Sequence, residues 1–313
     1  GQGPAWSNSL FEDNAEFGYG MLLAQKAIRD GLKEKVEALV ASTDKEDVKA
    51  AGQEWLDTFS VGATNGAATD KLVAALEACG CEAAKEILEQ KDFLSKKSQW
   101  IFGGDGWAYD IGFGGVDHVL ASGRDINVMV FDTEVYSNTG GQSSKATPTG
   151  AIAQFAAGGK EVKKKDMASI AMSYGYVYVA QISMGADFNQ TVKALAEAEA
   201  YPGPSLIIAY APCINHGIKK GMSKAQTEEE LAVKCGYWHN FRFNPAAENK
   251  FTLDSKAPDM DNYQDFLDGE VRYNSLKRQN PEKAARLFAK NESEAKERYD
   301  YLSKLTALYG KED

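Results

Sequence analysis

Two loops carry the residues best suited to chemistry in this 313-residue chain. The first, residues 103–107, reads Gly-Gly-Asp-Gly-Trp and places Asp105 between glycines. Glycines at a turn from strand to helix let backbone N–H groups approach a phosphate, whose charge the helix N-terminus favours. A carboxylate there would repel a diphosphate unless a cation lay between them. The combination therefore suggests Mg²⁺ or Ca²⁺ bridging Asp105 and phosphate oxygens.

The second loop, residues 132–142, reads Asp-Thr-Glu-Val-Tyr-Ser-Asn-Thr-Gly-Gly-Gln. Mg²⁺ takes about six oxygen ligands, usually few of them from protein. The Thr133 hydroxyl and the Val135 carbonyl have the chemistry to complete the set, and Asn138 adds an amide. Since Thr133 follows Asp105 by about one strand–helix–strand unit, we expect the two loops to be neighbours in space.

The Gly-Asp-Gly tripeptide has a simpler interpretation, as an ordinary turn in which Asp105 caps the following helix. By itself the motif is weak. Together with the second loop, at this spacing and after an apolar strand, it favours a cation and diphosphate site.

Alternating strands and helices must hold these loops. The run INVMVF at 126–131 is almost continuously apolar, which is typical of a strand buried on both faces. The sequence predicts strands at 98–102, 126–131, 176–182 and 204–209, and helices at 109–121, 166–174 and 189–200. This pattern predicts an α/β fold with a doubly wound, mostly parallel sheet. Ligands of such sheets bind at the carboxyl ends of the strands.

The rest of the chain is expected to be mainly helical. Residues 14–90 have the three-to-four spacing of apolar residues typical of helices, with a break at 62–66, GATNG. Polar helices are predicted at 227–235 and 281–308, and an acidic loop at 245–268. We therefore expect a helical N-terminal part, an α/β core with both loops and a helical C-terminal tail, at 1–97, 98–240 and 241–313.

Composition argues against several classes of partner. The chain has 35 Lys and Arg against 45 Asp and Glu, a net charge of −10. Such a chain repels phosphate backbones, so we expect no nucleic acid partner. The one dense basic run, KEVKKK at 160–165, is interpreted as a solvated helix or loop face. No apolar run reaches the roughly 18–20 residues of a membrane span, so we expect no membrane partner. The opening GQGPAWSNSL has neither Met nor the features of a signal peptide, and we expect the true beginning to be missing.

The cysteines number four and form no CxxC pair. They do not make a disulfide scaffold, so reduced thiols in the cytoplasm are expected. Cys79 and Cys81 form a CxC pair that is too tight for usual zinc spacings, and they are expected to be packed or idle thiols. Cys213 by itself reads as a buried thiol after a strand.

At this point the motifs carry a resemblance. GGDGWAYDIG at 103–112, followed by DTEVYSNTGGQ at 132–142, is similar to the thiamine-diphosphate motif, which runs from Gly-Asp-Gly to an Asn-containing loop. The residues of these two motifs resemble the C-terminal thiamine-diphosphate domain of the pyruvate:ferredoxin oxidoreductase family. WSNSLFEDNAEFGYGM at 6–21 and YAPCINHGI at 210–218 resemble the same family. The similarity runs over essentially the whole chain.

The resemblance implies a set of site residues. It makes Asp105, Thr133 and Val135 the Mg²⁺ ligands. It makes Asn138 a catalytic residue that faces the reacting end of the cofactor and the substrate. It makes Cys213 one ligand of the [4Fe–4S] cluster nearest the thiamine, which reverses the simpler interpretation of that thiol. The implied cofactor-binding residues are Gly104, Asp105, Gly106, Trp107, Thr133, Glu134, Val135, Tyr136, Ser137 and Asn138.

The three histidines receive lesser roles. His216 is expected to pack near the cluster or tune it, because Cys thiolates hold such clusters. His118 and His239 are expected to be structural.

The implied activity is oxidative decarboxylation of pyruvate to acetyl-CoA and CO₂. Electrons would pass through [4Fe–4S] clusters to ferredoxin or flavodoxin, and the acetyl group to coenzyme A. The remaining domains of the enzyme and a second copy, forming a homodimer, are the implied protein partners.

The chain also departs from the family's full pattern. A [4Fe–4S] cluster needs four thiolates, and Cys79, Cys81 and Cys235 do not sit at matching positions. The carboxylate that activates the aminopyrimidine and the arginine that fixes pyruvate are missing too. We therefore expect a fragment of the enzyme, or one piece of an assembly. Two alternatives remain open: a non-redox thiamine-diphosphate decarboxylase or synthase, and a cofactor-binding module without activity.

Overall fold

The computed structural model describes residues 12–310, so residues 6–11 of the family-like opening lie outside it. Contacts between residues divide the described chain into two compact units. One unit consists of residues 17–99. The other consists of residues 12–16 together with 100–310. Each unit has its own interior and is described by itself.

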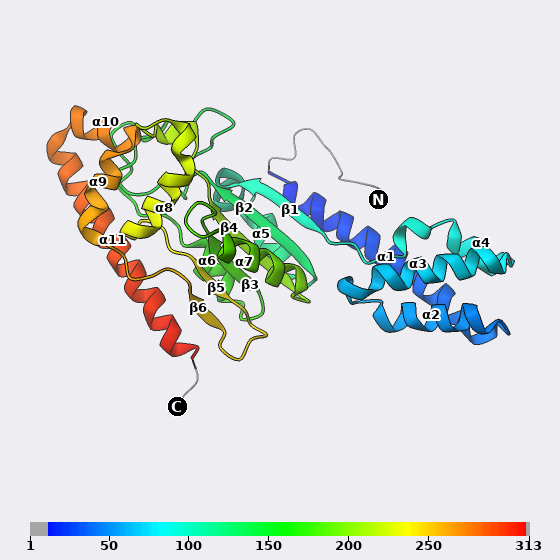
Figure 1. Ribbon diagram of the computed structural model, residues 1–313. Helices are drawn as coiled ribbons and strands as arrows, with labels where there is room; N and C mark the ends of the chain where they lie inside the picture. The colour runs from blue at the N-terminus through cyan, green and yellow to red at the C-terminus, as the bar shows by residue number, and fades with distance from the viewer. Residues whose placement is uncertain (1–11, 311–313) are drawn as a thin grey trace. The chain divides into compact units, whose positions relative to one another are not determined.

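The first unit is helical, as the spacing of its apolar residues predicts. It contains α1 (Asn14–Ser42) from Phe17 onward, α2 (Glu46–Thr58), α3 (Gly62–Cys79), α4 (Glu82–Leu88) and a 3₁₀ turn at Lys91–Phe93 (Figure 1). The apolar faces of these helices form one buried core, which includes Leu32, Val36, Trp55, Leu72, Leu76 and Ile87.

The break expected at 62–66 is wrong, because these residues form the first turns of α3. A buried polar contact explains the difference. Asn65 is fully buried, and its Oδ1 accepts hydrogen bonds from Arg29 Nη2 at 3.2 Å and from the Lys96 backbone N–H at 2.6 Å. Tertiary contacts of this kind override the weak helix propensity of the flanking glycines.

The described residues of the second unit form a six-stranded sheet in the order β1-β2-β4-β3-β5-β6. The strands β1 (Trp100–Gly104), β2 (Ile126–Asp132), β4 (Pro204–Tyr210) and β3 (Tyr178–Ile182) run parallel. Two short strands, β5 (Phe241–Phe243) and β6 (Phe251–Leu253), add antiparallel pairs beyond β3. The predicted α/β class and mostly parallel sheet are confirmed.

Helices cover both faces of this sheet. Every residue of β4 is buried, as expected for a central strand between two helical layers. Ala194 and Ala198 of α7 (Phe188–Ala200) pack with Ala180 and Ile207 of the strands. Figure 1 shows α7 in front of the sheet and α5 (Phe113–Ala121) behind it. A shorter helix, α6 (Met167–Met172), precedes β3.

The helix predicted at 109–121 is divided in two. A π-helical turn spans Gly106–Ile111, and α5 begins after Gly112. The Gly112 backbone N–H donates to the Trp107 carbonyl at 2.8 Å, and a Cβ at Gly112 would lie 2.2 Å from the Trp107 ring. The wide turn therefore exists because the buried indole occupies the space beside a glycine.

The C-terminal residues continue the second unit. They form α8 (Ala225–Cys235), β5 and β6, α9 (Tyr263–Asp268), α10 (Val271–Gln279) and the long α11 (Pro281–Leu308). The acidic loop expected at 245–268 is therefore only partly correct, since β6 and α9 lie inside it. Burial of Phe251 against Phe241 and burial of Tyr263 and Phe266 explain the added structure.

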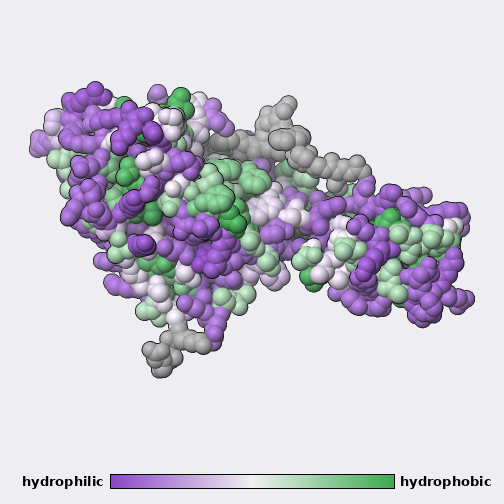
Figure 2. Space-filling view, viewed as in Figure 1, coloured by the Kyte–Doolittle hydropathy of each residue, from purple (hydrophilic) through white to green (hydrophobic). Residues whose placement is uncertain are grey.

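The surface in view is mainly polar. Figure 2 shows hydrophilic residues over most of the visible face, with apolar residues gathered in small patches. Within residues 12–310, no helix combines the length and the apolar character needed to cross a membrane.

Candidate cofactor site

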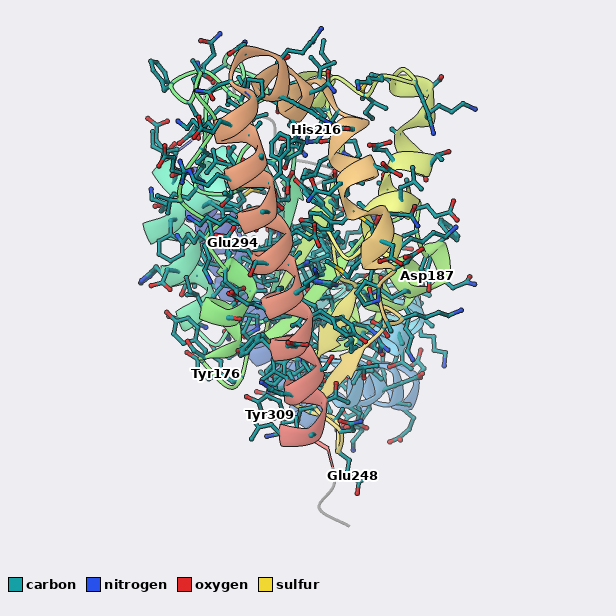
Figure 3. All side chains as sticks on the ribbon, turned by 90° about the vertical axis from the view of Figure 1, so that its left-hand side faces the viewer. Tyr176, Asp187, His216, Glu248, Glu294 and Tyr309 are labelled. Carbon is teal, nitrogen blue, oxygen red and sulfur yellow. The ribbon has the colours of Figure 1, made fainter. Side chains whose placement is uncertain are left out.

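The register of the sheet brings the two predicted loops together. β1 and β2 are aligned so that Gly104 pairs with Phe131, which puts Asp105 beside the residues that follow β2. Asp132 pairs in turn with Tyr210, so the segment after β4 joins the same edge. The carboxyl and amino ends of the parallel strands lie on opposite sides of the unit. Figure 3 shows this: His216, which follows the carboxyl end of β4, lies far from Tyr176, which precedes the amino end of β3. The carboxyl ends of parallel strands are where such sheets bind ligands.

Asp105 is the centre of this arrangement. Its carboxylate is fully buried. Oδ1 accepts from the Thr133 backbone N–H at 3.1 Å and lies 2.8 Å from Thr133 Oγ1. Oδ2 accepts from Ser144 Oγ at 2.6 Å. The side chain is thus held from two sides by the second loop and its continuation.

The Thr133 hydroxyl links Asp105 to Val135. Its Oγ1 lies 3.0 Å from the Val135 carbonyl oxygen. A carboxylate, a hydroxyl and a carbonyl oxygen therefore converge, which is the hard oxygen donor set that Mg²⁺ prefers. Ser137 Oγ, 3.4 Å from the same hydroxyl, lies at the edge of the group. The structure brings together the three residues expected to bind Mg²⁺, and their chemistry fits that ion.

Electrostatics favour a cation here. Burial, and then the nearby Asp132 carboxylate, raise the pKa of Asp105 to about 7, although hydrogen bonds from Ser144 and Thr133 oppose the rise. A bound cation would stabilise the ionised form and lower this pKa. The site is therefore arranged so that the ionised carboxylate gains most when a positive ion is present.

The glycines of the first loop make room for aromatic rings. A Cβ at Gly103 would lie 2.2 Å from the Trp107 ring, and one at Gly106 would lie 2.4 Å from the Tyr136 ring. Trp107 is almost fully buried. By contrast, a Cβ at Gly104 would meet nothing closer than 4.0 Å. Gly103 thus leaves room for a ring of its own loop, and Gly106 lets the first loop pack against Tyr136 of the second.

The loop that carries Asn138 is closed by backbone hydrogen bonds. The Tyr136 N–H donates to the Gln142 carbonyl at 2.9 Å, and the Gly141 N–H donates to the Tyr136 carbonyl at 2.8 Å. Ser137 and Asn138 are exposed at the tip of this closed loop. Asn138 is therefore available to a ligand outside the protein interior.

Cys213 lies in a loop that packs against the same region. The Ala211 N–H donates to the Asp132 carbonyl at 3.1 Å, and a methyl group on Gly141 would lie 2.7 Å from Asn215 Oδ1. The Cys213 backbone N–H donates to His216 Nδ1 at 2.8 Å. His216 is fully buried, and burial, followed by Arg272, holds its pKa well below the usual value. A neutral His216 ring thus fixes the backbone of the cysteine loop.

One thiol does not make an iron–sulfur site. Among residues 12–310, no group of three or more His, Cys, Asp or Glu side chains is placed to hold a metal ion. A [4Fe–4S] cluster takes four thiolates. The described residues therefore fit the role of a single ligand at Cys213 and no more.

Glu134 lies in a buried ionic cluster beneath the second loop. Its backbone N–H donates to Asp132 Oδ1 at 3.2 Å. Its carboxylate lies 2.9 Å from Lys164 Nζ and 2.8 Å from Arg272 Nη2, and accepts from the Tyr237 hydroxyl at 2.6 Å. Burial alone would raise its pKa, but Lys164 and Arg272 outweigh burial and lower the pKa to about 2. The Glu134 side chain is thus fully engaged inside the protein.

The basic run at 160–165 is only in part the solvated helix or loop face that was expected, because Glu161, Val162 and Lys163 are exposed and the other three residues are not. It forms no helix, and three of its lysines turn inward. Lys164 Nζ lies 2.7 Å from Asp132 Oδ2, Lys160 donates to the Ser144 carbonyl at 2.9 Å, and Lys165 donates to the Tyr109 carbonyl at 3.0 Å. Buried carboxylates need cationic partners, which explains the inward turn of Lys164, whereas Lys160 and Lys165 turn inward to backbone carbonyls.

Sequence reasoning missed Ser144, Lys164 and Arg272. Ser144 follows the Asn138 loop closely, so its position in the chain was a usable signal. The basic run, unusual in an acidic chain, was a signal for Lys164. Nothing local marked Arg272, which reaches Glu134 from a distant helix, α10.

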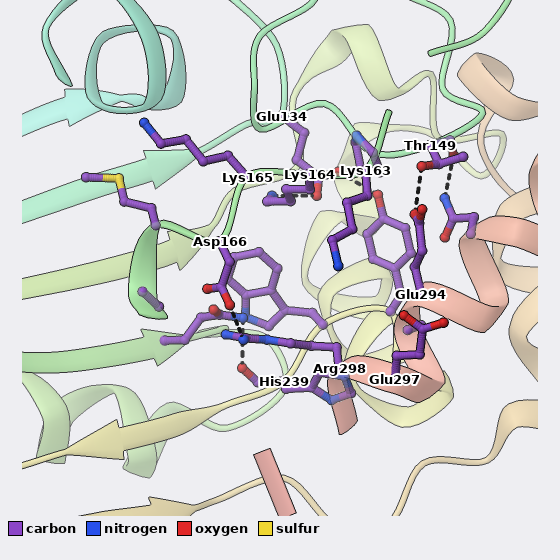
Figure 4. Close-up of a pocket in the computed structure, with 18 of the residues that line it drawn as sticks. Glu134, Thr149, Lys163, Lys164, Lys165, Asp166, His239, Glu294, Glu297 and Arg298 are labelled. Carbon is purple, nitrogen blue, oxygen red and sulfur yellow. Dashed lines mark hydrogen bonds and ion pairs between the residues drawn. The ribbon is translucent and has the colours of Figure 1, made fainter. Parts of the chain in front are cut away.

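A cavity of about 480 Å³ lies between the segment 163–169 and α11, and Glu134 of the second loop is part of its lining (Figure 4). Its charged lining is largely paired within the protein. Lys164 faces Glu134, Arg298 contacts Asp166, and Thr149 donates to Glu294 at 2.7 Å. These pairs leave little net charge to select a ligand.

Comparison with known proteins agrees with the geometry. Residues 78–209 match the family described as thiamine pyrophosphate enzyme, C-terminal TPP binding domain. This range contains both loops. The chain is 55% identical to a pyruvate-flavodoxin oxidoreductase of Enterobacter agglomerans over 98% of its length, and 54% identical to the pyruvate:ferredoxin oxidoreductase of Moorella thermoacetica over 97%. It spans 27% of each of those two proteins.

Among solved structures, a 2-oxoglutarate:ferredoxin oxidoreductase from Magnetococcus marinus, with 2-oxoglutarate, coenzyme A and succinyl-CoA bound, matches with a TM-score of 0.36 and 18% identity. The match covers 57% of this chain and 66% of that one, and the similarity is too low to add to the argument. The resemblance found in the motifs is confirmed by the other matches: residues 78–209 match the thiamine pyrophosphate-binding domain family, and almost the whole chain is similar to about a quarter of a pyruvate-flavodoxin and a pyruvate:ferredoxin oxidoreductase.

Proposed function

We propose that this chain binds thiamine diphosphate and Mg²⁺ as part of an oxidoreductase that converts pyruvate to acetyl-CoA and CO₂. The observation that carries the proposal is the convergence of Asp105, Thr133 Oγ1 and the Val135 carbonyl at the carboxyl ends of β1 and β2. The names of the similar proteins support pyruvate as substrate and flavodoxin or ferredoxin as acceptor. They do not favour a non-redox thiamine enzyme.

Asp105, Thr133 and Val135 would hold Mg²⁺, and the cofactor diphosphate would lie between the two loops. Ser144 orients Asp105 by donating to Oδ2, so the opposite oxygen remains directed at Thr133. Gly104, Gly106, Trp107 and the segment Thr133–Asn138 would line the diphosphate. When bound, thiamine diphosphate supplies the electron sink for the loss of CO₂ from a 2-oxoacid.

Asn138 and Cys213 would act nearer the reacting end. Asn138, exposed at its loop tip, would donate its amide to the bound cofactor or substrate. Cys213 would supply one of the four thiolates of a [4Fe–4S] cluster, the others coming from residues beyond those described. Coenzyme A, the remaining domains of the enzyme, a homodimeric assembly and a cytoplasmic location complete the proposal.

The sharpest test replaces Asp105 with Asn. The amide keeps the shape but removes the negative charge, so we expect Mg²⁺-dependent binding of thiamine diphosphate, measured by calorimetry, to be lost. Asp110→Asn is the matched control, because Asp110 lies in the same turn but pairs with Lys145 at 2.6 Å. Unchanged affinity in Asp105→Asn would show that the Gly-Asp-Gly segment is only a turn.

A second test separates the cofactor site from electron transfer. In the complete enzyme, Cys213→Ala should leave thiamine diphosphate binding intact while lowering the iron content and stopping ferredoxin reduction. Cys235→Ala is the control, because Cys235 is buried away from solvent at the end of α8. Full iron content and normal ferredoxin reduction in Cys213→Ala would remove Cys213 from the cluster.

A further inference from the structure

Cys79 and Cys81 lie side by side at the junction of α3 and α4. Cys79 is the last residue of α3, and Cys81 is the residue just before α4. Gly80 between them adopts a left-handed backbone, with φ 64° and ψ 7°. This conformation, which suits glycine, folds the chain so that the two Sγ atoms are 2.9 Å apart. The pair expected to be idle is therefore a preformed dithiol.

The surroundings of the pair differ from those of an inert, buried thiol. Both cysteines are partly exposed at the edge of the helical core. Hydrogen bonds from the Cys81 thiol and backbone N–H lower the pKa of Cys79. Lys45, whose Nζ donates to the Cys79 carbonyl at 3.0 Å, places a positive charge nearby and adds to the effect. A partly exposed thiol beside a cation is the environment of reactive cysteines.

We infer that Cys79 and Cys81 form a reversible dithiol–disulfide pair that exchanges two electrons with small-molecule disulfides. The S–S bond length is about 2.05 Å, so less than about 1 Å of movement separates the thiols from a bond. The cysteine at the end of α3 reacts first, and its neighbour resolves the product.

The exchange balances in two steps. The Cys79 thiolate attacks one sulfur of the small disulfide, which forms a mixed disulfide and releases one thiolate. The Cys81 thiol then loses its proton to solvent and attacks Cys79 Sγ, which forms the Cys79–Cys81 bond and releases the second thiolate. The chain gives up two electrons, the small disulfide takes them up, and each released thiolate gains a proton.

Cys235 provides a contrast within the same chain. Cys235 is buried, and burial raises its pKa to about 12, so it is largely a protonated and inaccessible thiol. Its Sγ lies 3.6 Å from the Ala232 carbonyl oxygen. Thiol exchange requires a thiolate and access to solvent. We therefore expect oxidation of the pair to leave Cys235 unchanged.

The experiment incubates the chain without oxygen in oxidised glutathione, blocks free thiols with iodoacetamide and maps peptides by mass spectrometry. Trypsin cleaves after Lys71 and Lys85, which puts Cys79 and Cys81 in one peptide, apart from Cys213 and Cys235. We expect this peptide to be lighter by two hydrogen atoms, with no alkylation and no glutathione. Dithiothreitol should restore both alkylation sites.

Two variants show whether the cysteines act as a pair. Cys81→Ser should lose the intramolecular bond completely and keep one glutathione on Cys79. Lys45→Met should form the same disulfide more slowly. Circular dichroism checks that each variant keeps the helix content of the wild type. Two free thiols in the wild-type peptide, or a separate glutathione on each cysteine, would overturn the proposal.

Discussion

The helical unit has a mainly apolar interior, whereas the interior beneath the Asp105 and Thr133 loops is ionised. In the first, Val36, Leu72 and Leu76 are completely buried. In the second, Glu134 and Arg272 are buried as a salt bridge, with Lys164 completing the cluster from its edge. Hydrophobic burial stabilises without direction, whereas an ion pair holds its partners in one geometry.

The difference shows which unit is shaped for binding. Glu134 has a positive φ of 60°, an uncommon backbone for a residue with a side chain. Lys164 and Arg272 hold its carboxylate and so hold Thr133 and Val135 on either side of it. A buried ion pair often adds no more stability than an apolar replacement would. The ionised interior is thus better understood as a support for the second loop than as a source of stability.

The largest expected effect comes from removing a charge from this interior. Arg272→Met leaves Glu134 and Glu270 buried without their shared cation, so we expect a loss of about 3–5 kcal/mol in unfolding free energy. Urea unfolding gives the magnitude, and hydrogen exchange by mass spectrometry shows which unit is affected. Faster exchange should be confined to residues 100–310. A loss below about 1 kcal/mol would mean that the cluster is not a coupled unit.

The helical unit should respond to loss of volume instead. Leu72→Ala leaves a cavity in the apolar core, and we expect a loss of about 2–5 kcal/mol confined to residues 17–99. Because no charge is removed, the loss should not change with salt concentration. Leu23→Ala, at a position 38% exposed in α1, is the control, with an expected change within about 0.5 kcal/mol. A strong salt dependence of the Leu72 effect would contradict the distinction between the two interiors.

The same contrast explains what the sequence could reveal. The helical unit and the parallel strands follow from local patterns: apolar spacing in α1 to α3, and continuous apolar runs in β2 and β4. The Asp105 and Thr133 loops could be paired in advance because parallel strands bring their carboxyl ends to one edge. Where the packing partner is distant, local patterns were misleading. Asn65 was placed in a break because its contact with Arg29 is not visible in its own segment.

The ionic cluster could not be assembled from sequence for a similar reason. Lys164 looked like part of a solvated basic run, since five of the run's six residues are charged. Its partners, Asp132 and Glu134, lie about 30 positions earlier, and Arg272 is more than 100 positions later. Periodicity reports how one segment divides between core and solvent. It does not report which charge pairs with which.

The pH dependence of stability should also distinguish the two units, because the three histidines all lie outside residues 17–99. His239 is only 3% exposed, and burial, followed by Arg298, lowers its pKa to about 4. The unfolded chain binds the proton near pH 6.5, whereas the folded chain does so only near pH 4. Stability from the neutral ring is therefore present above pH 6.5 and is lost as the pH falls towards 4. The loss at pH 5 is about 2 kcal/mol.

His239→Asn removes this titration. Between pH 7 and pH 5 the variant should lose about 2 kcal/mol less stability than the wild type, as measured by urea unfolding at each pH. Exchange rates in residues 17–99 should not differ between variant and wild type. Equal losses in the two proteins would show that the buried ring accepts a proton in the folded state.

The smallest expected loss of stability comes from an exposed ion pair. Lys277 lies on the same helix as Arg272, α10, so the two residues compare an exposed charge with a buried one. Lys277 Nζ is 2.6 Å from Asp268 Oδ2, but the two side chains are 53% and 37% exposed. Water and salt screen such a pair, so Lys277→Met should cost no more than about 1 kcal/mol, and less at high salt. Urea unfolding beside Arg272→Met makes the comparison within one helix. If the two variants lost equal stability, charge alone would account for both, and the distinction between the ionised interior and the surface would fail.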